Sequence, residues 1–290
     1  MIDWRNGSDL DRVAELRTDP EWVLAAWANP DTVLLRVGDA SVEAGADGAL
    51  LTRRVEADFD PELHYLLGRI EGRPWFATRV EAEEELTALR SLMDGLPAAG
   101  LEAAFTAVGL ATWHAGSGFC PRCSAPTRAV HGGQSRKCTA CGLELYPRTD
   151  PAVIVAIVDP DNRLLLGRQP SWAPGRYSVF AGFVEVGESL EQTVHREMAE
   201  EVGLELTGVT YLGSQPWPFP RSLMVGFLAH TTRDEPVPAV GEIELARWFT
   251  HEQLVAAMAA REVLLPPHTS IARRMIESWL DGTLAHHTAG

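Results

Sequence analysis

Three glutamates in one short segment have the types and spacing that could bind divalent metal ions. In GFVEVGESLEQTVHREMAEEVGL, residues 182–204, Glu197, Glu200 and Glu201 are related as i, i+3 and i+4. On a helix these positions share one face, with Cβ atoms about 5–6 Å apart. Clustered carboxylates repel one another unless hard cations bridge them, and ligand sets made only of oxygen suit Mg²⁺ or Mn²⁺. The spacing therefore favours a metal-binding face.

The residues around the glutamates predict the helix that would hold them. Ser189 and Gln192 have the spacing of a capping box, and Gly203 is typical of a helix end, so we expect a helix over about 189–202. An apolar stripe runs beside the acidic face: Leu190, Val194, Met198 and Val202. The carboxylates therefore border the packed side. A solvated acidic face is the alternative for an isolated pair of glutamates.

The whole segment resembles the Nudix box, GX5EX7REUXEEXGU, in which U is apolar. All nine specified positions match: Gly182, Glu188, Arg196, Glu197, Met198, Glu200, Glu201, Gly203 and Leu204. The resemblance implies hydrolysis of a nucleoside diphosphate linked to another moiety, with Glu197, Glu200 and Glu201 as catalytic residues. It also implies the Mg²⁺ or Mn²⁺ ligands: Ala181 through its carbonyl, Glu197, Glu200, Glu201 and, outside the box, Glu242. Arg196 is expected to orient a glutamate by ion pairing.

Four cysteines have the spacing of a zinc site. Cys120 and Cys123 form one CxxC pair, and Cys138 and Cys141 form a second pair after fourteen intervening residues. Each CxxC turn directs two thiolates to one point, and four thiolates complete the tetrahedral shell of a structural Zn²⁺. Disulfides are the alternative, and they are disfavoured in a chain without a secretory signal. We expect a structural zinc ribbon without a catalytic role.

A second signature follows the Nudix box. SQPWPFPRS, residues 214–222, resembles the SQPWPFPxS signature of the NADH pyrophosphatase branch of Nudix hydrolases, in which a four-cysteine ribbon also precedes the Nudix domain. The prolines stiffen an extended loop, and its aromatic rings can stack on a planar base. A proline-rich connector with core aromatics is the alternative. The resemblance implies these substrate contacts: Arg90, Tyr146, Phe183, Gln215, Pro216, Trp217, Pro218, Phe219, Pro220, Arg221, Ser222, Met224 and Ala272.

The motifs divide the chain into expected domains. There are three of them: a smaller α+β domain over 1–115, the four-cysteine ribbon over 116–147 and the Nudix domain over 148–282. In the first, the sequence predicts short strands within 31–54, a hairpin over 64–80, and helical spacing over 81–96 and 98–114. The task of this domain is left open.

The Nudix segment alternates between strand and helix signals. Two apolar runs flank the turn Asp159–Asn162, and Thr250 with Gln253 has the spacing of another capping box. Further strands are expected at 209–215, 222–232 and 244–250, and a last helix at 270–280. This order predicts an α/β (α+β) fold with helices packed on a sheet. The resemblance makes it the Nudix α/β/α sandwich.

The composition bounds the partners and the location. The chain has 290 residues, of which 46% are hydrophobic and 22% charged, as in a globular protein. Its net charge of −15 argues against broad electrostatic binding to DNA or anionic membranes, but permits a phosphate substrate held through metal ions. With no apolar signal region at the start and no apolar run of membrane-spanning length, we expect a cytoplasmic protein with no membrane partner.

The resemblance implies a zinc-containing NADH pyrophosphatase that uses Mg²⁺ or Mn²⁺. It would cleave NADH, and NAD⁺ less well, to AMP and the reduced or oxidised nicotinamide mononucleotide. Because the branch includes enzymes that remove NAD caps from RNA 5′ ends, NAD-capped RNA is a further candidate substrate. The dimeric habit of the branch implies a homodimer, with Tyr146 and Phe183 contributing across the interface. Two alternatives stay open: a broader dinucleotide or ADP-ribose pyrophosphatase, and a Nudix-fold sensor that binds nucleotides without hydrolysis.

Overall fold

The chain divides into two units, and the computed structural model describes its residues 6–80, 86–232 and 235–284. One unit comprises Met1–Thr149 with Trp217–Arg221, and the other comprises Asp150–Pro216 with Ser222–Gly290. The break after Thr149 lies close to the start expected for the Nudix domain. The further division of the first unit at residue 115 stays a prediction.

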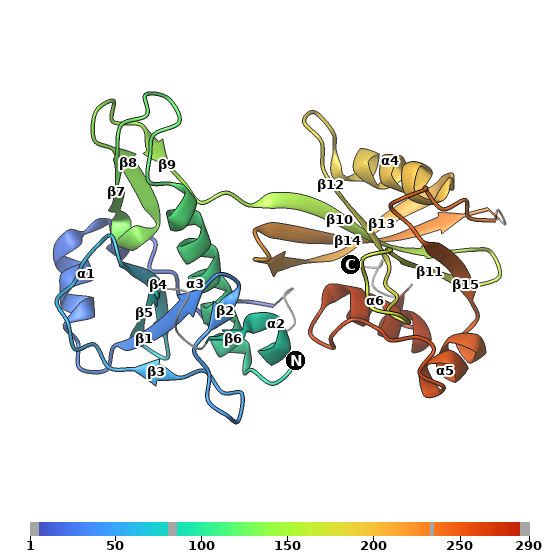
Figure 1. Cartoon of the computed structure of the whole chain (residues 1–290), viewed down its shortest axis with the longest axis horizontal. Coiled ribbons are helices and arrows are strands. Elements are labelled where there is room, and N and C mark those ends of the chain that lie inside the picture. Colours follow the sequence, from blue (N-terminus) through green and yellow to red (C-terminus); the bar gives the residue numbers. More distant parts are fainter. Residues whose placement is uncertain (1–5, 81–85, 233–234, 285–290) are drawn as a thin grey trace. The chain divides into compact units, whose positions relative to one another are not determined.

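A six-stranded sheet is the larger of the two sheets in the described part of the first unit (Figure 1). Its order is β4 (His64–Ile70), β5 (Arg73–Arg79), β1 (Val33–Gly38), β2 (Ser41–Val42) and β6 (Thr87–Ala88), with β3 (Thr52–Arg53) paired to β1. The predicted hairpin is confirmed: β4 and β5 are antiparallel, and both Glu71 and Gly72 of their turn have positive φ.

Alternate residues of this sheet supply two cores, as the period of a strand requires. Tyr65 and Leu67 pack with α3 (Ala98–Gly116), whereas Leu66 lies in a cluster with residues of α1 (Pro20–Trp27). The short 3-10 helix η1 (Leu16–Thr18) precedes α1. Sheet and helix segments thus enclose hydrophobic side chains on both faces of β4.

The helical spacing expected over 81–96 is wrong for most of its described part. Residues 81–85 lie outside the described residues, Thr87–Ala88 form strand β6, and only Leu89–Leu92 form a helix, α2. The reason is strand pairing, because Val42 and Ser41 of β2 pair with β6. Such tertiary pairing overrides the local periodicity of a short segment.

The four cysteines lie in a small ribbon of the first unit. Its sheet has the order β7 (Thr127–Val130), β8 (Ser135–Cys138) and β9 (Glu144–Leu145), all antiparallel, with the 3-10 turn η2 (His131–Gly133) between β7 and β8. The short connections bring both CxxC turns to the same end of the ribbon.

The second unit is built on a mixed sheet. Its order is β13 (Leu206–Trp217), β14 (Ser222–Thr231), β10 (Asp150–Val158), β11 (Leu164–Arg168) and β15 (Leu245–Phe249), with β12 (Phe180–Phe183) paired to β10. Strands β10 and β14 are parallel, and Asp150 is opposite Ser222. The strands expected on both sides of the turn Asp159–Asn162 and after residue 204 are confirmed.

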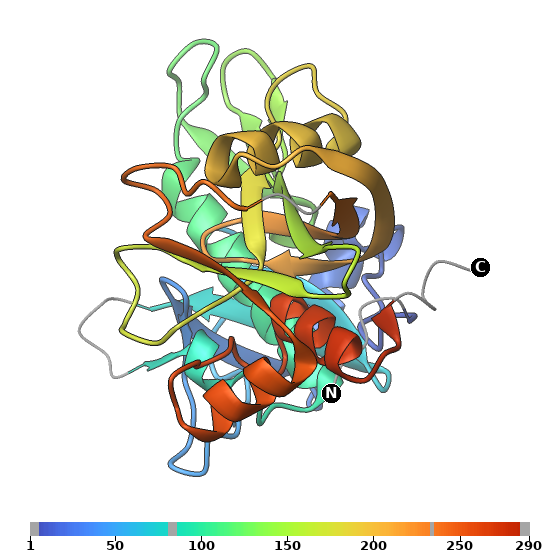
Figure 2. The ribbon, with the colours of Figure 1, turned by 90° about the vertical axis from the view of Figure 1, so that its right-hand side faces the viewer.

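Helices cover both faces of this sheet (Figure 2). Val153, Val155 and Ile157 of β10 pack with α4 (Leu190–Val202). The alternate residues Ile154 and Ala156 pack with α5 (His251–Ala259) and α6 (Ile271–Leu280). The unit therefore has the α/β/α sandwich architecture predicted for it.

None of the helices in the described part of the chain combines the length and the hydrophobicity that a membrane crossing requires.

Candidate active site

Helix α4 presents the acidic face and has the predicted ends. The Ser189 hydroxyl accepts from the backbone N–H of Gln192, the Gln192 side chain accepts from the N–H of Ser189, and Gly203 follows the last turn at φ 66°. Val194 and Met198 of the apolar stripe are fully buried in the sheet core. This packing fixes which way the glutamate face points.

Glu201 is the most enclosed carboxylate of that face. It is 7% exposed, and its Oε2 has no hydrogen-bond partner in the described structure. Burial, followed by repulsion from Glu197, Glu242 and Glu200, raises the pKa of Glu201 to about 8. A buried carboxylate oxygen without a donor, surrounded by further acids, has the environment that a cation ligand requires.

The close approach of β12 to α4 explains the first glycine of the signature. A Cβ added at Gly182 would overlap the Glu197 carboxyl group. Only glycine therefore lets this strand pass directly beside the glutamate. Ala181, whose carbonyl is a predicted metal ligand, precedes Gly182 on β12 and pairs with Ile154 of β10.

Arg196 gathers the acidic groups around one guanidinium. It forms ion pairs with Glu188 at 2.6 Å, Glu197 at 2.9 Å and Glu200 at 3.1 Å, and donates to the Phe183 carbonyl over 3.0 Å. Hydrogen bonding by Arg196, and then by the backbone N–H of Glu185, lowers the pKa of Glu188 to about 2. Glu188 is thus an ion-pair partner of Arg196 rather than a member of the carboxylate cluster around Glu201.

A cavity of about 550 Å³ opens in front of the glutamates. Among the predicted residues, Phe183, Glu197, Glu201 and Glu242 line it. A smaller cavity of about 110 Å³ is lined by both Ala181 and Glu201. Glu200 is exposed, pairs with Arg196 and does not line either cavity. The larger volume suits a phosphate-bearing ligand.

Backbone contacts bring Glu242 to this site from outside the box. The Glu201 carbonyl accepts from the N–H of Ala239 over 2.8 Å, and the Val202 carbonyl accepts from the N–H of Val237 over 2.8 Å. The segment before Glu242 is therefore held along the end of α4, and Glu242 lines the larger cavity.

Sequence reasoning missed one wall of the larger cavity. Gln169, Pro170 and Ser171, which follow β11, line it together with Gly241. Arg168 holds this segment, because it donates to the Trp172 carbonyl over 2.9 Å and pairs with Glu244 at 2.9 Å. A glutamine followed by proline and serine has no distinctive spacing, so the sequence alone offers no signal for this wall.

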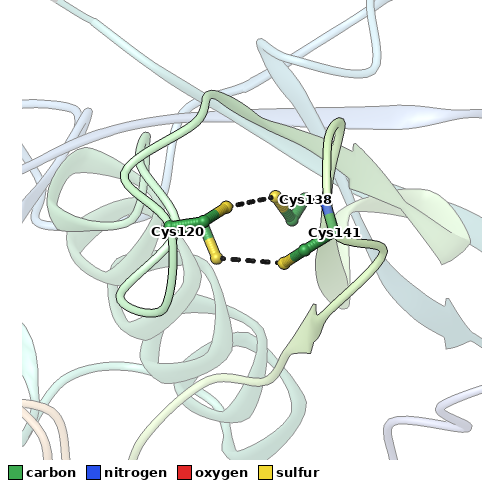
Figure 3. A group of neighbouring side chains, drawn as sticks. Cys120, Cys138 and Cys141 are labelled. Carbon is green, nitrogen blue, oxygen red and sulfur yellow. Dashed lines mark hydrogen bonds between the residues drawn. The ribbon is translucent and has the colours of Figure 1, made fainter.

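The four cysteines form a closed cluster in the ribbon (Figure 3). Their sulfurs lie within 4.8 Å of one another, with Cys120–Cys141 at 3.7 Å and Cys123–Cys138 at 3.5 Å, and the four thiols are free. A tetrahedral zinc with Zn–S bonds of about 2.3 Å requires sulfur–sulfur edges of about 3.8 Å. The cluster therefore has the dimensions of a zinc site.

Backbone amides support the thiolate form of one of these cysteines. The N–H groups of Cys141 and Ala140 both donate to the sulfur of Cys138 over 3.4 Å. These bonds, the one from Cys141 first, lower the pKa of Cys138 to about 6. A thiolate is the form that binds a metal.

A buried arginine ties the ribbon to the rest of the first unit. Arg136 is 5% exposed, pairs with Glu62 at 2.7 Å and contacts the Nδ1 atom of His114 at 2.8 Å. Arg136 is therefore a structural residue, and its buried charge is not accessible for binding nucleic acid.

The aromatic signature lies at the junction of β13 and β14. Trp217 and Phe219 are half-buried against the core of the first unit, Pro218 is buried, and the Phe219–Pro220 peptide bond is cis. Arg90 lies over both rings, with its Cζ 4.6 Å from the Phe219 centroid and 5.4 Å from that of Trp217. The structure thus brings Arg90 together with this predicted loop.

The other predicted substrate contacts differ in accessibility. Gln215 is fully buried, accepts from the N–H of Ile271 over 2.7 Å and donates to the Thr269 carbonyl over 2.9 Å, so its side chain holds the start of α6. Ser222 and Ala272 are also buried. Tyr146 and Phe183 are 65% and 57% exposed. The contact of each of these residues with substrate stays a prediction.

Comparison with known proteins identifies two domains in the chain. The NADH pyrophosphatase zinc ribbon domain matches residues 117–146, and the NUDIX domain matches residues 148–275. The chain is 42% identical to the NAD-capped RNA hydrolase NudC of Mycobacterium bovis over 289 residues, a match that covers 93% of this chain and 92% of that relative. It is 41% identical to the NAD-capped RNA hydrolase NudC of Deinococcus radiodurans over 221 residues, which cover 74% of this chain and 76% of that relative.

Proposed function

Because the chain belongs to the Nudix hydrolases, in the family of NAD-capped RNA hydrolases with the NADH pyrophosphatase zinc ribbon, we propose that it hydrolyses the pyrophosphate of NADH and NAD⁺. We propose further that it removes NAD caps from RNA 5′ ends. Water adds to one phosphorus, and the bridging P–O bond breaks. From NADH the products are AMP and reduced nicotinamide mononucleotide. The cap carries the same pyrophosphate bond, so one site serves all these substrates.

The buried Glu201 carboxylate carries this proposal. Its Oε2 lacks a hydrogen-bond partner in the described structure, and Glu197 and Glu242 line the same cavity. These oxygens fit Mg²⁺ or Mn²⁺, and the ligand set would comprise Glu197, Glu201, Glu242, the Ala181 carbonyl and Glu200. A bound divalent cation would neutralise the pyrophosphate and lower the pKa of water.

The surrounding residues prepare this site for the substrate. Arg196 holds Glu197 and Glu200 by ion pairs, which limits their movement when the cavity is filled. Glu200, exposed beside the cluster, would assist as a ligand or accept the proton of the attacking water. Phe183 lines the cavity and supplies an aromatic surface for the nucleotide.

The aromatic loop would select the dinucleotide. Trp217 and Phe219 offer ring faces, and Arg90 adds a guanidinium plane next to them. A nucleobase or nicotinamide ring can stack on such surfaces, each stack contributing about 1–3 kcal/mol. This loop favours a dinucleotide over a simple nucleoside diphosphate.

The thiol cluster and the exposed aromatics support two further parts of the proposal. The four cysteines would bind one structural Zn²⁺, since they leave no open coordination position.

Tyr146 and Phe183 are large, exposed aromatic residues, as expected of an interface, and we assign them to a homodimer with composite sites. The cytoplasmic location stays a prediction.

Product analysis tests the function. The protein is incubated with NADH, NAD⁺, ADP-ribose and NAD-capped RNA, each with Mg²⁺ or Mn²⁺, and the products are separated by chromatography. We expect AMP with reduced nicotinamide mononucleotide from NADH, and a 5′-monophosphate RNA from capped RNA. Equal rates on ADP-ribose would favour the broader pyrophosphatase. Nucleotide binding without any product would favour the sensor.

Light scattering during gel filtration tests the homodimer, and a monomer mass would contradict it.

A further inference from the structure

The N-terminal unit contributes none of the proposed metal ligands, yet it holds the tip of the substrate loop. Trp217–Arg221 belong to this unit, although the strands that they join belong to the other. Trp217 and Phe219 pack against the core that contains α3 and the first sheet. The support for these rings is therefore a feature of the N-terminal unit.

Helix α3 meets the loop with one side. Phe105, 4% exposed, contacts Phe219 edge to face, with ring centroids 5.9 Å apart. Gly109, one turn further on the same side of the helix, lies beneath Pro218, since a Cβ at Gly109 would be 3.9 Å from the proline Cβ. The loop thus rests on a flat part of the helix next to one protruding ring.

The contact with Phe105 continues through the loop. Phe219 meets Trp217 in a second edge-to-face contact, with centroids 5.1 Å apart and planes at 80°. Edge-to-face packing prescribes the orientation of each ring relative to its neighbour. Phe219 therefore contacts both of the other rings and connects Phe105 to Trp217.

We propose that Phe105 is a positioning residue for the substrate loop. Its buried ring orients Phe219, and through Phe219 it orients Trp217, so that the aromatic surface is formed before the dinucleotide binds. This inference rests on the proposed function and gives the N-terminal unit a part in it. When the surface is preformed, substrate binding does not have to order the loop. The entropy cost of binding is therefore smaller, and the affinity for the substrate is higher.

Steady-state kinetics with NADH test the proposal on three variants of the full chain. Phe105→Ala removes the ring, and Phe105→Leu keeps most of the bulk without an aromatic edge. Leu110→Ala is the matched control, because Leu110 is as buried as Phe105 on the same helix but lies five residues further on and faces another direction.

We expect Phe105→Ala to raise KM for NADH about tenfold while kcat stays within about threefold, because the loop affects binding and not the metal site. Phe105→Leu should give an intermediate KM. Leu110→Ala should lower the melting temperature as Phe105→Ala does, with KM unchanged. If Leu110→Ala raised KM equally, or if Phe105→Ala left KM unchanged, the positioning role would be overturned.

Hydrogen exchange gives a readout that does not depend on turnover. The amides of Trp217, Phe219 and Arg221 alternate with prolines, and they should exchange faster in Phe105→Ala than in Leu110→Ala. Equal exchange in the two variants would contradict the proposal. A wild-type protein inactive on every dinucleotide would instead refute the proposed function, so the two failures are distinguishable.

Discussion

Arg196 and Glu188 form a two-point ion pair: Nε donates to Oε1 over 2.6 Å, and Nη2 donates to Oε2 over 2.8 Å. The parallel arrangement matches the fork of a guanidinium to a carboxylate, which gives direction as well as strength. Thr193 also donates to Glu188 Oε2, over 2.9 Å. Glu188 therefore acts on the glutamate face through Arg196, which in turn holds Glu197 and Glu200.

The first prediction concerns this pair. Glu188→Gln removes the charge that fixes Arg196, so the arginine should sample other positions around Glu197 and Glu200. We expect kcat to fall about tenfold, because the metal ligands stay present but are held less firmly. The measurement is steady-state kinetics with saturating Mn²⁺. A loss as large as that of Glu201→Gln would show that Glu188 itself contacts the metal or the substrate.

The second prediction concerns the buried ligand. Glu201→Gln keeps the shape of the side chain but removes one charge from the cluster, so kcat should fall a hundredfold or more, about 3 kcal/mol or more, with little change in KM. The fold should survive, because the apolar stripe and both caps of α4 are unchanged. Circular dichroism checks this point. Glu191→Gln, an exposed position on the same helix, is the control and should retain activity. Near-normal kcat in Glu201→Gln would show that this carboxylate is not an essential metal ligand.

The third prediction concerns the aromatic loop. Trp217→Ala should weaken NADH binding by about 1–3 kcal/mol, seen mainly in KM, if a planar ring stacks on the indole. Trp22→Ala removes an indole that packs against a different cluster of the N-terminal unit, and it should leave KM unchanged. Unchanged kinetics in Trp217→Ala would mean that the loop aromatics serve only the fold.

The fourth prediction concerns the ribbon metal. Protein purified without added zinc should contain about one zinc per chain by elemental analysis, because a four-thiolate site binds it tightly. A chelator should lower the melting temperature, since the binding free energy of a structural zinc contributes to folding. Added zinc should reverse the change. Disulfides in place of zinc, detected by mass spectrometry, would contradict this prediction.

The fifth prediction concerns pH. Burial lowers the pKa of His114 from 6.5 to about 4; the Gly133 carbonyl partly opposes the shift, whereas Arg136 adds to it. Between these two values the unfolded chain binds a proton that the folded chain excludes. The free energy of unfolding should therefore fall as the pH drops from about 6.5 towards 4, by up to about 3 kcal/mol from this group.

Urea unfolding of wild type and His114→Gln checks the sign. The difference in the free energy of unfolding between the two proteins should become smaller as the pH falls from about 7.5 to about 5. The reason is that only wild type loses the contribution of the neutral imidazole. Other titrating groups are common to both proteins and cancel. A difference that does not vary with pH would show that His114 titrates normally.

The spacing of residues along the chain was sufficient to predict the local parts of the site. The capping box of Ser189 with Gln192, the stop at Gly203 and the shared face of Glu197 and Glu201 depend only on the period of a helix. The two CxxC turns likewise determine their own geometry. These features follow from sequence because each involves residues within a few positions of one another.

Only the tertiary structure decided the relationships between distant segments. Glu242 reaches the cavity because Ala239 and Val237 bond to the end of α4, and Gln169 reaches it because Arg168 holds the following turn. Thr87–Ala88 form a strand because β2 supplies partners, against the helical spacing of the segment. The rings of Trp217 and Phe219 pack with the core of the N-terminal unit, where Phe219 contacts Phe105 of α3. Strand pairing and burial bring together residues far apart in the chain, and no local period encodes which of them will meet.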